Sequence, residues 1–384
     1  MGENIIKMNN ILITGGAGFI GSNLALKLIE KGYNITILDN LSTQIHGQNP
    51  ETESPLYASI KNSVTFIKGS VTKVEDWKKA IRNQNVIVHF AAETGTGQSM
   101  YEISKYVDVN INGTAIMLDL LANEAHNVQK VVIASSRSIY GEGKYLSDDF
   151  GVVYPEHRTS EYMDKGDFEV KFNGSSKLTL LPTDEDSKIH PSSVYGITKQ
   201  NQEQMIMTVC PTIGIAPVAF RYQNVYGPGQ SLKNPYTGIL SIFSTQIKNG
   251  NDLNIFEDGM ESRDFVFIDD VVEATILGIE NQAANNQIFN VGSGEPTTVT
   301  DVANSLVKHY GSDTKITITG NYRLGDIRHN FADLTKIKEI LGFEPKFNFS
   351  RGIELFADWV NKQEIEQDNY QRSIEEMKSK GLFK

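Results

Sequence analysis

Short apolar runs alternate with amphipathic stretches through the first part of the chain. Six runs have the length and composition of buried strands: 10–14, 34–39, 64–69, 86–92, 130–136 and 217–222. Between several of them apolar residues recur at helical spacing, as Ile20, Leu24 and Leu28 do in residues 20–31, and the run 110–125 is similar. Apolar strands that alternate with helices are typical of a parallel sheet covered on both faces. The pattern therefore predicts an α/β fold with a doubly wound parallel sheet.

A glycine-rich turn joins the first predicted strand to the first predicted helix. In ILITGGAGFIGSNLALKLIEKG, Gly15, Gly18 and Gly21 have the spacing of a dinucleotide-binding turn, in which the helix N-terminus faces a pyrophosphate. Asp39 ends the second strand, where a carboxylate can accept both adenosine ribose hydroxyls and repels a 2′-phosphate. A glycine turn without a ligand is the alternative, but the strand before it and the helix after it favour a Rossmann-type site. The following residues, NLSTQ, contain no cation, so the expected cofactor is NAD.

Tyr195 and Lys199 stand four residues apart in HPSSVYGITKQNQEQM, on a predicted helix that begins near 191–193. Residues at this spacing share a helix face, so the ammonium can lie close to the phenol. A nearby positive charge, together with that of the nicotinamide, lowers a tyrosine pKa from ~10 toward neutrality. A phenolate of that kind is a general base toward a sugar hydroxyl. An exposed pair without a role is the alternative, which the dinucleotide turn and the serines that end strand 130–136 disfavour.

Four motifs together resemble a known family. GGAGFIG, HFAA after the fourth strand, SSRSIYG and YGITK are similar to the extended short-chain dehydrogenases/reductases, and within them to the NAD-dependent nucleoside-diphosphate-sugar epimerases and dehydratases. The resemblance covers residues from about 9 to 360. It implies a Rossmann-type sheet with a smaller C-terminal substrate-binding domain, NAD as cofactor and a nucleoside-diphosphate sugar as partner. It also implies a homodimer that pairs through helices near 110–125 and 194–209.

The resemblance implies a division of the chain into domains. Residues 1–220 form the NAD-binding domain, which contains an insertion at 142–188 and is joined by 264–292. The nucleotide-sugar-binding domain comprises 221–263 and 293–360. The charged stretch 361–384 is expected to be a surface helix or a tail, and no function is assigned to it.

The resemblance also implies roles for individual residues. Ser136 matches the catalytic serine or threonine, Tyr195 the base and Lys199 its helper. Cofactor contacts are expected from Gly15, Gly18, Phe19, Ile20, Gly21, Asp39, Asn40, Ser70, Val71, Ala91, Ala92, Asn110, Tyr195 and Lys199. Substrate contacts are expected from Glu93, Thr94, Ser136, Arg137, Asn224, Arg263, Arg323 and Asp326. Arg328 is a further phosphate clamp or a surface ion pair, and Tyr140 is predicted to be structural.

The chain departs from the family pattern in two places. Gly69-Ser70 stands where the family often has Gly-Asp for the adenine, which leaves the backbone of Val71 for this contact. Ser136 and Tyr195 are 59 residues apart, more than twice the ordinary separation, so 142–188 is an insertion. Long connections are usually functional or separately folded. We consider a flap over the sugar pocket, a dimer contact or a tolerated surface loop. The insertion has one histidine and no cysteine, so no metal site is expected.

The two residues after Ser136 bear on the reaction. Sugar dehydratases and decarboxylases of the family carry a carboxylate there, whereas this chain has Arg137 and Ser138, neither of which can replace it. The sequence therefore predicts inversion at carbon 4 of the sugar through a 4-keto intermediate. Residues 89–114, the insertion and 221–247 most resemble enzymes that interconvert dTDP-L-rhamnose and dTDP-6-deoxy-L-talose. A UDP-glucose or UDP-N-acetylglucosamine 4-epimerase is the alternative, followed by a net ketosugar reductase and a non-catalytic sensor.

Composition adds limits to this interpretation. The 384 residues carry a net charge of −11, which disfavours nucleic acid or an anionic membrane as partner. A bound diphosphate therefore requires local arginines. Cys210 is the single cysteine, which fits a reducing cytoplasm. No apolar run approaches the ~18 residues of a spanning helix, and MGENIIKMNN lacks the apolar core of a signal peptide. A cytoplasmic location is expected.

Overall fold

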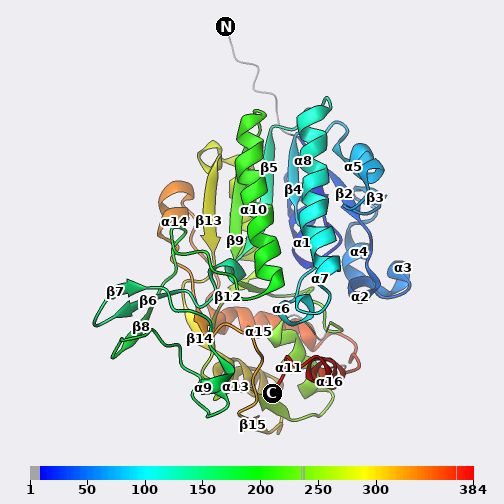
Figure 1. The fold of residues 1–384 in the computed structure, drawn as a ribbon. Coiled ribbons are helices and arrows are strands. Elements are labelled where there is room, and N and C mark those ends of the chain that lie inside the picture. Colours follow the sequence, from blue (N-terminus) through cyan, green and yellow to red (C-terminus); the bar gives the residue numbers. More distant parts are fainter. Residues whose placement is uncertain (1–8, 235, 237, 369) are drawn as a thin grey trace.

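A seven-stranded parallel sheet forms the centre of the molecule (Figure 1). The computed structural model describes residues 9–234, 236, 238–368 and 370–384. The strands are β1 (Asn10–Thr14), β2 (Asn34–Asp39), β3 (Thr65–Lys68), β4 (Val86–His89), β5 (Lys130–Ser136), β9 (Ala216–Tyr222) and β13 (Gln287–Val291). Their order is β13-β9-β5-β4-β1-β2-β3, and every pairing is parallel. This order is that of a Rossmann-type sheet, the fold class predicted from the sequence. The sequential order of the strands reverses between β1 and β4.

All six predicted strands belong to this sheet. The predicted run 86–92 ends as a strand at His89, because the chain then turns into the loop that borders the site. The seventh strand, β13, comes from a later segment and pairs with β9 at the edge of the sheet. Its short apolar run did not stand out in the sequence.

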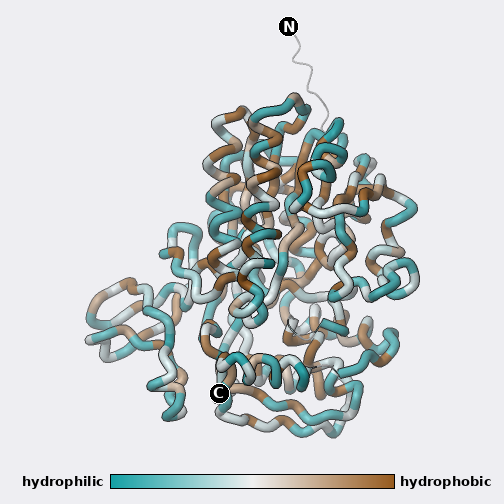
Figure 2. Tube along the Cα trace, turned by 45° about the vertical axis from the view of Figure 1, so that its right-hand side comes forward, coloured by the Kyte–Doolittle hydropathy of each residue, from teal (hydrophilic) through white to brown (hydrophobic). Residues whose placement is uncertain are grey.

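Helices cover both faces of the sheet, as the alternating pattern predicts. On one face lie α1 (Phe19–Glu30) and α12 (Ile268–Glu280), whose apolar residues join one core cluster. On the other face lie α5 (Val74–Ile81), α8 (Gly113–Asn123) and α10 (Val194–Thr212), whose apolar residues join a second cluster. Figure 2 shows hydrophobic residues concentrated along these central elements. The helix predicted over 110–125 is preceded by a π-helical turn, η1 (Val107–Asn112).

Helix α10 begins where its sequence predicts. The Ser193 side chain accepts a hydrogen bond from the Gly196 amide at 3.1 Å, which satisfies one of the free N–H groups of the first turn. The cap directly precedes Tyr195, so it fixes the end of the helix that carries the expected base.

A smaller layer lies below the carboxyl ends of the sheet strands (Figure 1). It contains β10 (Asn224–Tyr226), β11 (Leu253–Ile255), β12 (Ser262–Phe267), β14 (Pro296–Thr298), β15 (Ile316–Ile318), β16 (His329–Asn330), α11 (Ile239–Lys248), α13 (Val299–Tyr310) and α15 (Phe349–Val360). The remaining helices are α2 (Thr43–His46), α3 (Pro50–Glu53), α4 (Pro55–Ile60), α6 (Thr96–Ser99), α7 (Ile103–Tyr106), α9 (Ser160–Met163), α14 (Thr335–Leu341), α16 (Tyr370–Ser379) and the 3-10 turns η2 (Arg137–Tyr140) and η3 (Gln282–Ala284). Within the described residues, none of these helices combines the length and apolar character needed to cross a membrane.

The insertion 142–188 forms a separate antiparallel sheet that projects from the side of the molecule (Figure 1). Its strands are β6 (Lys144–Ser147), β7 (Gly151–Val153) and β8 (Leu178–Leu181), in the order β7-β6-β8. Tyr145, Val153 and Val170 form a small core of their own. The segment is therefore folded rather than a plain surface loop.

Candidate active site

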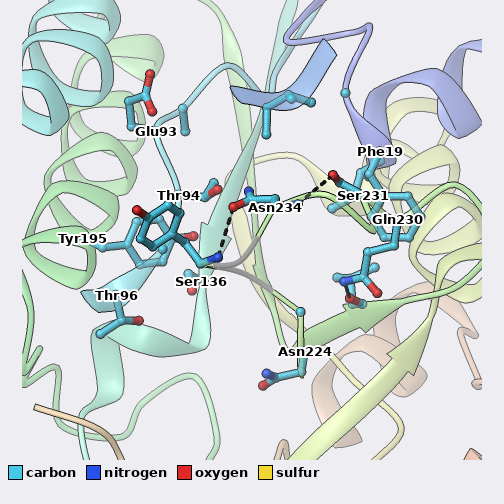
Figure 3. A pocket seen from close by; sticks show the side chains of 18 of the residues that line it. Phe19, Glu93, Thr94, Thr96, Ser136, Tyr195, Asn224, Gln230, Ser231 and Asn234 are labelled. Carbon is cyan, nitrogen blue, oxygen red and sulfur yellow. Dashed lines mark hydrogen bonds between the residues drawn. The ribbon is translucent and has the colours of Figure 1, made fainter. Parts of the chain in front are cut away.

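A cavity of about 580 Å³ lies at the carboxyl ends of the sheet strands, between the sheet and the smaller layer. In α/β sheets this edge, at the reversal of strand order, is where ligands bind. The cavity brings together nearly every residue that the sequence singled out: Gly15, Gly18, Phe19, Ile20, Gly21, Asp39, Asn40, Ser70, Val71, Ala91, Ala92, Glu93, Thr94, Ser136, Arg137, Tyr195, Lys199, Asn224, Arg263, Arg323 and Asp326. Figure 3 shows Tyr195 and Ser136 on one side of it, with Phe19 and Gln230 on the other.

The glycine turn is packed too closely to hold side chains. A Cβ on Gly21 would lie 2.5 Å from the Gly15 carbonyl oxygen, and one on Gly15, whose φ is +66°, would lie 2.8 Å from the Ala91 amide nitrogen. The backbone can therefore approach a pyrophosphate at the start of α1. This cradle fits a dinucleotide.

Asp39 is held in place at the ribose end of this cradle. Its carboxylate accepts hydrogen bonds from the Ala17 amide at 3.0 Å and the Leu41 amide at 2.8 Å. Burial raises the pKa of Asp39, while these two amides and His46 act in the opposite direction. The neighbouring lining residues Asn40, Ser42 and Gln44 are neutral, so this end offers no cation to a 2′-phosphate.

Ser136 and Tyr195 meet at the end of β5. The Ser136 hydroxyl accepts hydrogen bonds from the Ser138 amide at 3.2 Å and the Ser138 hydroxyl at 2.9 Å. Burial raises the pKa of Tyr195, whereas hydrogen bonding with Ser136 and the positive charge of Arg137 lower it. The sequence predicted that Lys199 and the nicotinamide would lower the pKa of Tyr195. The contribution of Arg137 to this lowering was not predicted. Tyr195 and Ser136 together can hold and deprotonate a hydroxyl.

Lys199 belongs to a buried polar network. Its ammonium donates to the Gln202 side-chain oxygen at 2.7 Å, and the Gln202 amide donates to the Thr114 hydroxyl at 2.9 Å. Burial lowers the pKa of Lys199 to about 7, against the influence of Glu203. Gln202 therefore holds the ammonium in position and stabilises its charged form.

Replacement of Gln202 by leucine tests this network. Without the acceptor, the charged form of Lys199 is less stable, so its pKa falls and the alkaline limb of the pH–rate profile moves to lower pH. A lost hydrogen bond to a charged group costs about 1.5–3 kcal/mol, so we expect kcat near pH 8 to fall roughly tenfold or more. Gln204→Leu is the control, because Gln204 is exposed on the same helix. An unchanged profile in Gln202→Leu would contradict the role of Gln202.

Arg137 and Arg263 line the cavity without a carboxylate partner within the described part of the chain. Arg263 donates to the carbonyl oxygens of Ser262 and Arg328, both at 2.9 Å. Burial lowers the pKa of Arg137 to about 9 and also lowers that of Arg263, and the two positive charges repel one another. Two adjacent guanidinium groups that lack counter-ions suit a diphosphate.

Arg323 and Asp326 form an ion pair at 2.9 Å on the same side of the cavity. Further polar atoms there have no hydrogen-bond partner among the described residues, namely the side-chain amide of Gln223 and Oδ1 of Asn224. Buried polar groups are normally satisfied, so these atoms are suited to a bound ligand.

Several lining residues were not predicted: Gln223, Gln230, Ser231, Asn234, Phe256, Glu261 and Tyr370. Gln223 directly precedes Asn224 in RYQNVYGPG, so its place next to a predicted substrate residue could have identified it as a lining residue. Nothing in the local sequence marks Tyr370, which reaches the cavity only because α16 folds back onto it.

Two predicted residues lie outside the cavity lining. Asn110 is fully buried behind the wall, where its side-chain oxygen accepts from the Glu93 amide at 2.8 Å and its amide donates to the Thr198 hydroxyl at 2.9 Å. It thus joins the loop that carries Glu93 to helix α10. Arg328 is also fully buried, bound to Glu257 at 3.0 Å and to Asp258, so it is neither a phosphate clamp nor a surface ion pair.

The insertion does not form a flap over this cavity. No described residue of 142–188 lines it. Instead Arg158 of the insertion lies outside the cavity lining. It donates to the Glu257 carboxylate at 2.7 Å and to the carbonyl oxygen of Asp326, a lining residue, at 2.9 Å. The insertion therefore supports the loop that carries Arg323 and Asp326.

Tyr140, close in sequence to Ser136, is structural as predicted. It is buried, and its hydroxyl donates to Asn290 at 2.7 Å and accepts from Arg221 at 2.8 Å.

The family model described as the NAD dependent epimerase/dehydratase family matches residues 11–165 and 171–292. The chain belongs to this family. A dTDP-L-rhamnose 4-epimerase from Burkholderia thailandensis is 34% identical over 369 residues, which are 95% of this chain and 98% of that protein. A UDP-glucose 4-epimerase from Thermotoga maritima, solved with UDP-glucose, is 30% identical with a TM-score of 0.75, over 92% of this chain and 99% of that chain. A UDP-glucuronic acid 4-epimerase from Bacillus cereus, solved with UDP-glucuronic acid and NAD, is 25% identical with the same TM-score and coverage.

Membership of the NAD dependent epimerase/dehydratase family confirms the resemblance seen in the motifs, the Rossmann-type fold and NAD as the cofactor. The protein is an enzyme of this family. The glycine turn, Asp39 and the Tyr195–Lys199 face are the residues that fit NAD in this chain.

Proposed function

We propose that this protein inverts carbon 4 of a nucleoside-diphosphate sugar, with dTDP-L-rhamnose and dTDP-6-deoxy-L-talose as the preferred pair. The observation that carries the proposal is the composition of one cavity. It combines the Ser136–Tyr195 pair with two guanidinium groups, Arg137 and Arg263, that have no counter-ion among the described residues, and none of its described residues puts a carboxylate beside Ser136. The first pair suits a sugar hydroxyl, and the guanidinium groups suit a diphosphate.

The chain's own groups divide the work as follows. Ser136 holds the 4-hydroxyl of the sugar, and Tyr195 takes its proton and later returns it. The glycine turn and Asp39 would hold NAD, which would supply reversible hydride transfer at carbon 4. Lys199, positioned by Gln202, keeps positive charge beside the cofactor, while Arg137 favours the phenolate of Tyr195. Arg137 and Arg263 hold the diphosphate so that the sugar can rotate within the cavity, and Arg323 with Asp326 lies at the nucleotide end.

The acids of the cavity argue for epimerisation rather than elimination of water. The described lining contains Asp39, Glu93, Glu261 and Asp326. Asp39 belongs to the cofactor cradle, and Asp326 pairs with Arg323. Glu261 lies just before β12, near Arg263 and 4.0 Å from Arg328. Glu93 forms an ion pair with Lys105 at 3.1 Å, and Figure 3 shows its carboxylate pointing away from Ser136. Elimination needs a carboxylic acid at the reacting carbon, and the position of Ser138 offers only a hydroxyl that binds Ser136.

The choice of sugar rests on similarity. The Burkholderia thailandensis relative acts on dTDP-L-rhamnose according to its name, and it matches nearly the full length of this chain. UDP-glucose and UDP-N-acetylglucosamine are the second candidates, since UDP-sugar 4-epimerases share this fold at similar coverage. We also propose the domain division given above, with β13 as the contribution of 264–292 to the NAD-binding domain.

A homodimer is part of the proposal. Ile197 on α10 is exposed, and so are Ile103 and Val107 beside the start of α8. Ile197 lies on one of the two helices through which pairing is expected, and Ile103 and Val107 lie on α7 and η1, just before the other. Exposed apolar patches of this kind mark interaction sites.

Incubation with dTDP-, UDP-, GDP- and CDP-sugars, with NMR of the products, tests the function. We expect inversion at carbon 4 without added reductant, fastest with dTDP-L-rhamnose. Protein purified without added cofactor should contain bound nicotinamide. A requirement for stoichiometric NADH would identify a ketosugar reductase instead, and faster turnover of UDP-glucose or UDP-N-acetylglucosamine would reassign the substrate.

Ser138→Glu should not produce a dehydratase, because Arg137 still supplies no acid.

A further inference from the structure

Residues 370–384, the last part of the charged stretch 361–384, contribute to the wall of the cavity. Helix α16 buries Ser373, Ile374 and Met377, and its first residue, Tyr370, lines the cavity. Figure 1 shows α16 beside α11 and beneath α6, against the smaller layer. The charged C-terminal stretch, to which the sequence assigned no function, thus contributes Tyr370 to the cavity wall.

The end of this segment is hydrogen-bonded to residues 322–324, which include Arg323. Tyr322 and Lys384 exchange two backbone hydrogen bonds, at 2.8 and 3.0 Å, and Leu324 donates to the Leu382 carbonyl at 3.1 Å. Arg323 pairs with Phe383 in the antiparallel bridge between them. The position of Arg323 therefore depends on residues at the far end of the segment.

Phe256, which also lines the cavity, is surrounded by the side chains of Tyr370, Phe383 and Arg323. The Tyr370 ring stacks on it at 6.5 Å with an angle of 21° between the planes, and the Phe383 ring meets it edge-on at 4.9 Å. The Arg323 guanidinium lies over its face, 5.3 Å from the ring centre. Three aromatic rings and a guanidinium thus form one packed unit at this end of the cavity.

Helix α16 also touches the other wall. The Tyr236 hydroxyl donates to the Glu376 carboxylate at 2.6 Å, and Tyr236 is a lining residue. A Cβ on Gly97, in α6, would lie 3.2 Å from the Met377 sulfur, and Tyr101 packs against the cluster that contains Met377 and Phe383. The segment therefore spans from α6 of the NAD-binding half to the substrate half.

We infer that residues 370–384 close the nucleoside-diphosphate end of the cavity and that Tyr370 contacts the nucleoside diphosphate directly. Planar heterocycles bind to exposed aromatic faces, and guanidinium groups bind phosphates. Tyr370 supplies such a ring at the cavity wall, with Phe256 stacked against it, and Arg263 and Arg323 supply the guanidinium groups. This inference rests on the proposed function, because it assumes a nucleotide-bearing substrate in this cavity.

Tyr370→Leu tests the contact, with dTDP and UDP as probes in calorimetric titrations of the NAD-loaded protein. Leucine keeps an apolar side chain against Phe256 but removes the ring, and loss of one stacking contact weakens binding by about tenfold. We expect that loss for both nucleotides, with NAD content unchanged and KM for the sugar nucleotide raised more than kcat is lowered. Arg372→Ala, an exposed position on the same helix, should bind like the wild type.

Deletion of residues 370–384 tests the segment as a whole. We expect a larger loss of nucleotide binding than in Tyr370→Leu, with NAD retained. If the deletion also releases NAD, the fold is disturbed and Tyr370→Leu alone decides. Wild-type binding of dTDP and UDP by Tyr370→Leu would overturn the inference and leave the proposed function intact. Failure of the wild-type protein to bind either nucleotide would overturn both.

Discussion

Tyr195→Phe should lower turnover by about a thousandfold while NAD stays bound, because general acid–base groups contribute factors of roughly 10² to 10⁴. The substitution removes only the hydroxyl, and the ring keeps its place on α10 beside Ser136. The cofactor cradle of Gly15, Gly21 and Asp39 is untouched. The measurement is the rate of carbon 4 inversion by NMR, together with the nicotinamide content of the purified variant.

Tyr140→Phe is the matched control for this experiment. It removes a hydroxyl that binds Asn290 and Arg221, which lies outside the cavity lining. We expect a less stable protein with a near-normal kcat. If Tyr195→Phe turned over substrate at a rate close to that of the wild type, Tyr195 would not be the base and the proposed mechanism would fail.

Arg158→Leu should reduce the free energy of unfolding by about 3–5 kcal/mol, the usual cost of breaking a buried ion pair from one side. Arg158 is buried between the carboxylates of Glu142 and Glu257, at 3.3 and 2.7 Å. Leucine is apolar and leaves both carboxylates without this partner. Arg328 still binds Glu257, so Glu142 carries most of the uncompensated charge.

The deficit of Arg158→Leu should depend on pH. Burial already raises the pKa of Glu142, and Arg158 lowers it, so the variant has a still higher pKa in the folded state. A carboxyl whose folded pKa exceeds its unfolded pKa loses stability as pH rises above the unfolded value. We therefore expect a larger deficit in urea unfolding at pH 8 than at pH 5.

Lys171→Leu provides the control for the stability experiment. Lys171 pairs with Asp167 at 2.6 Å on the exposed surface of the same insertion. Exposed pairs contribute about 0–1 kcal/mol, so the variant should unfold close to the wild type. Equal deficits for Arg158→Leu and Lys171→Leu would show that the buried network does not hold the insertion in place.

Local pattern was enough to predict much of this protein. The six apolar runs became sheet strands because a strand buried on both faces needs a short continuous apolar stretch. The glycine turn, Asp39 and the Tyr195–Lys199 spacing could also be recognised in the sequence, because each depends only on residues within one helical turn or one strand–helix unit. The absence of a carboxylate after Ser136 was likewise visible in the chain itself.

The tertiary structure decided what depends on residues far apart in sequence. Arg263 and Arg328 look alike in the chain, yet one lines the cavity and the other is buried among Glu257 and Asp258, because charges pair according to proximity in space. Asn110 lies behind the cavity wall, and Arg158 of the insertion supports Asp326 rather than covering the sugar. Tyr370 lies 175 residues after Tyr195 and lines the same cavity. Periodicity reports which face of an element is buried, but only packing determines which distant segment covers it.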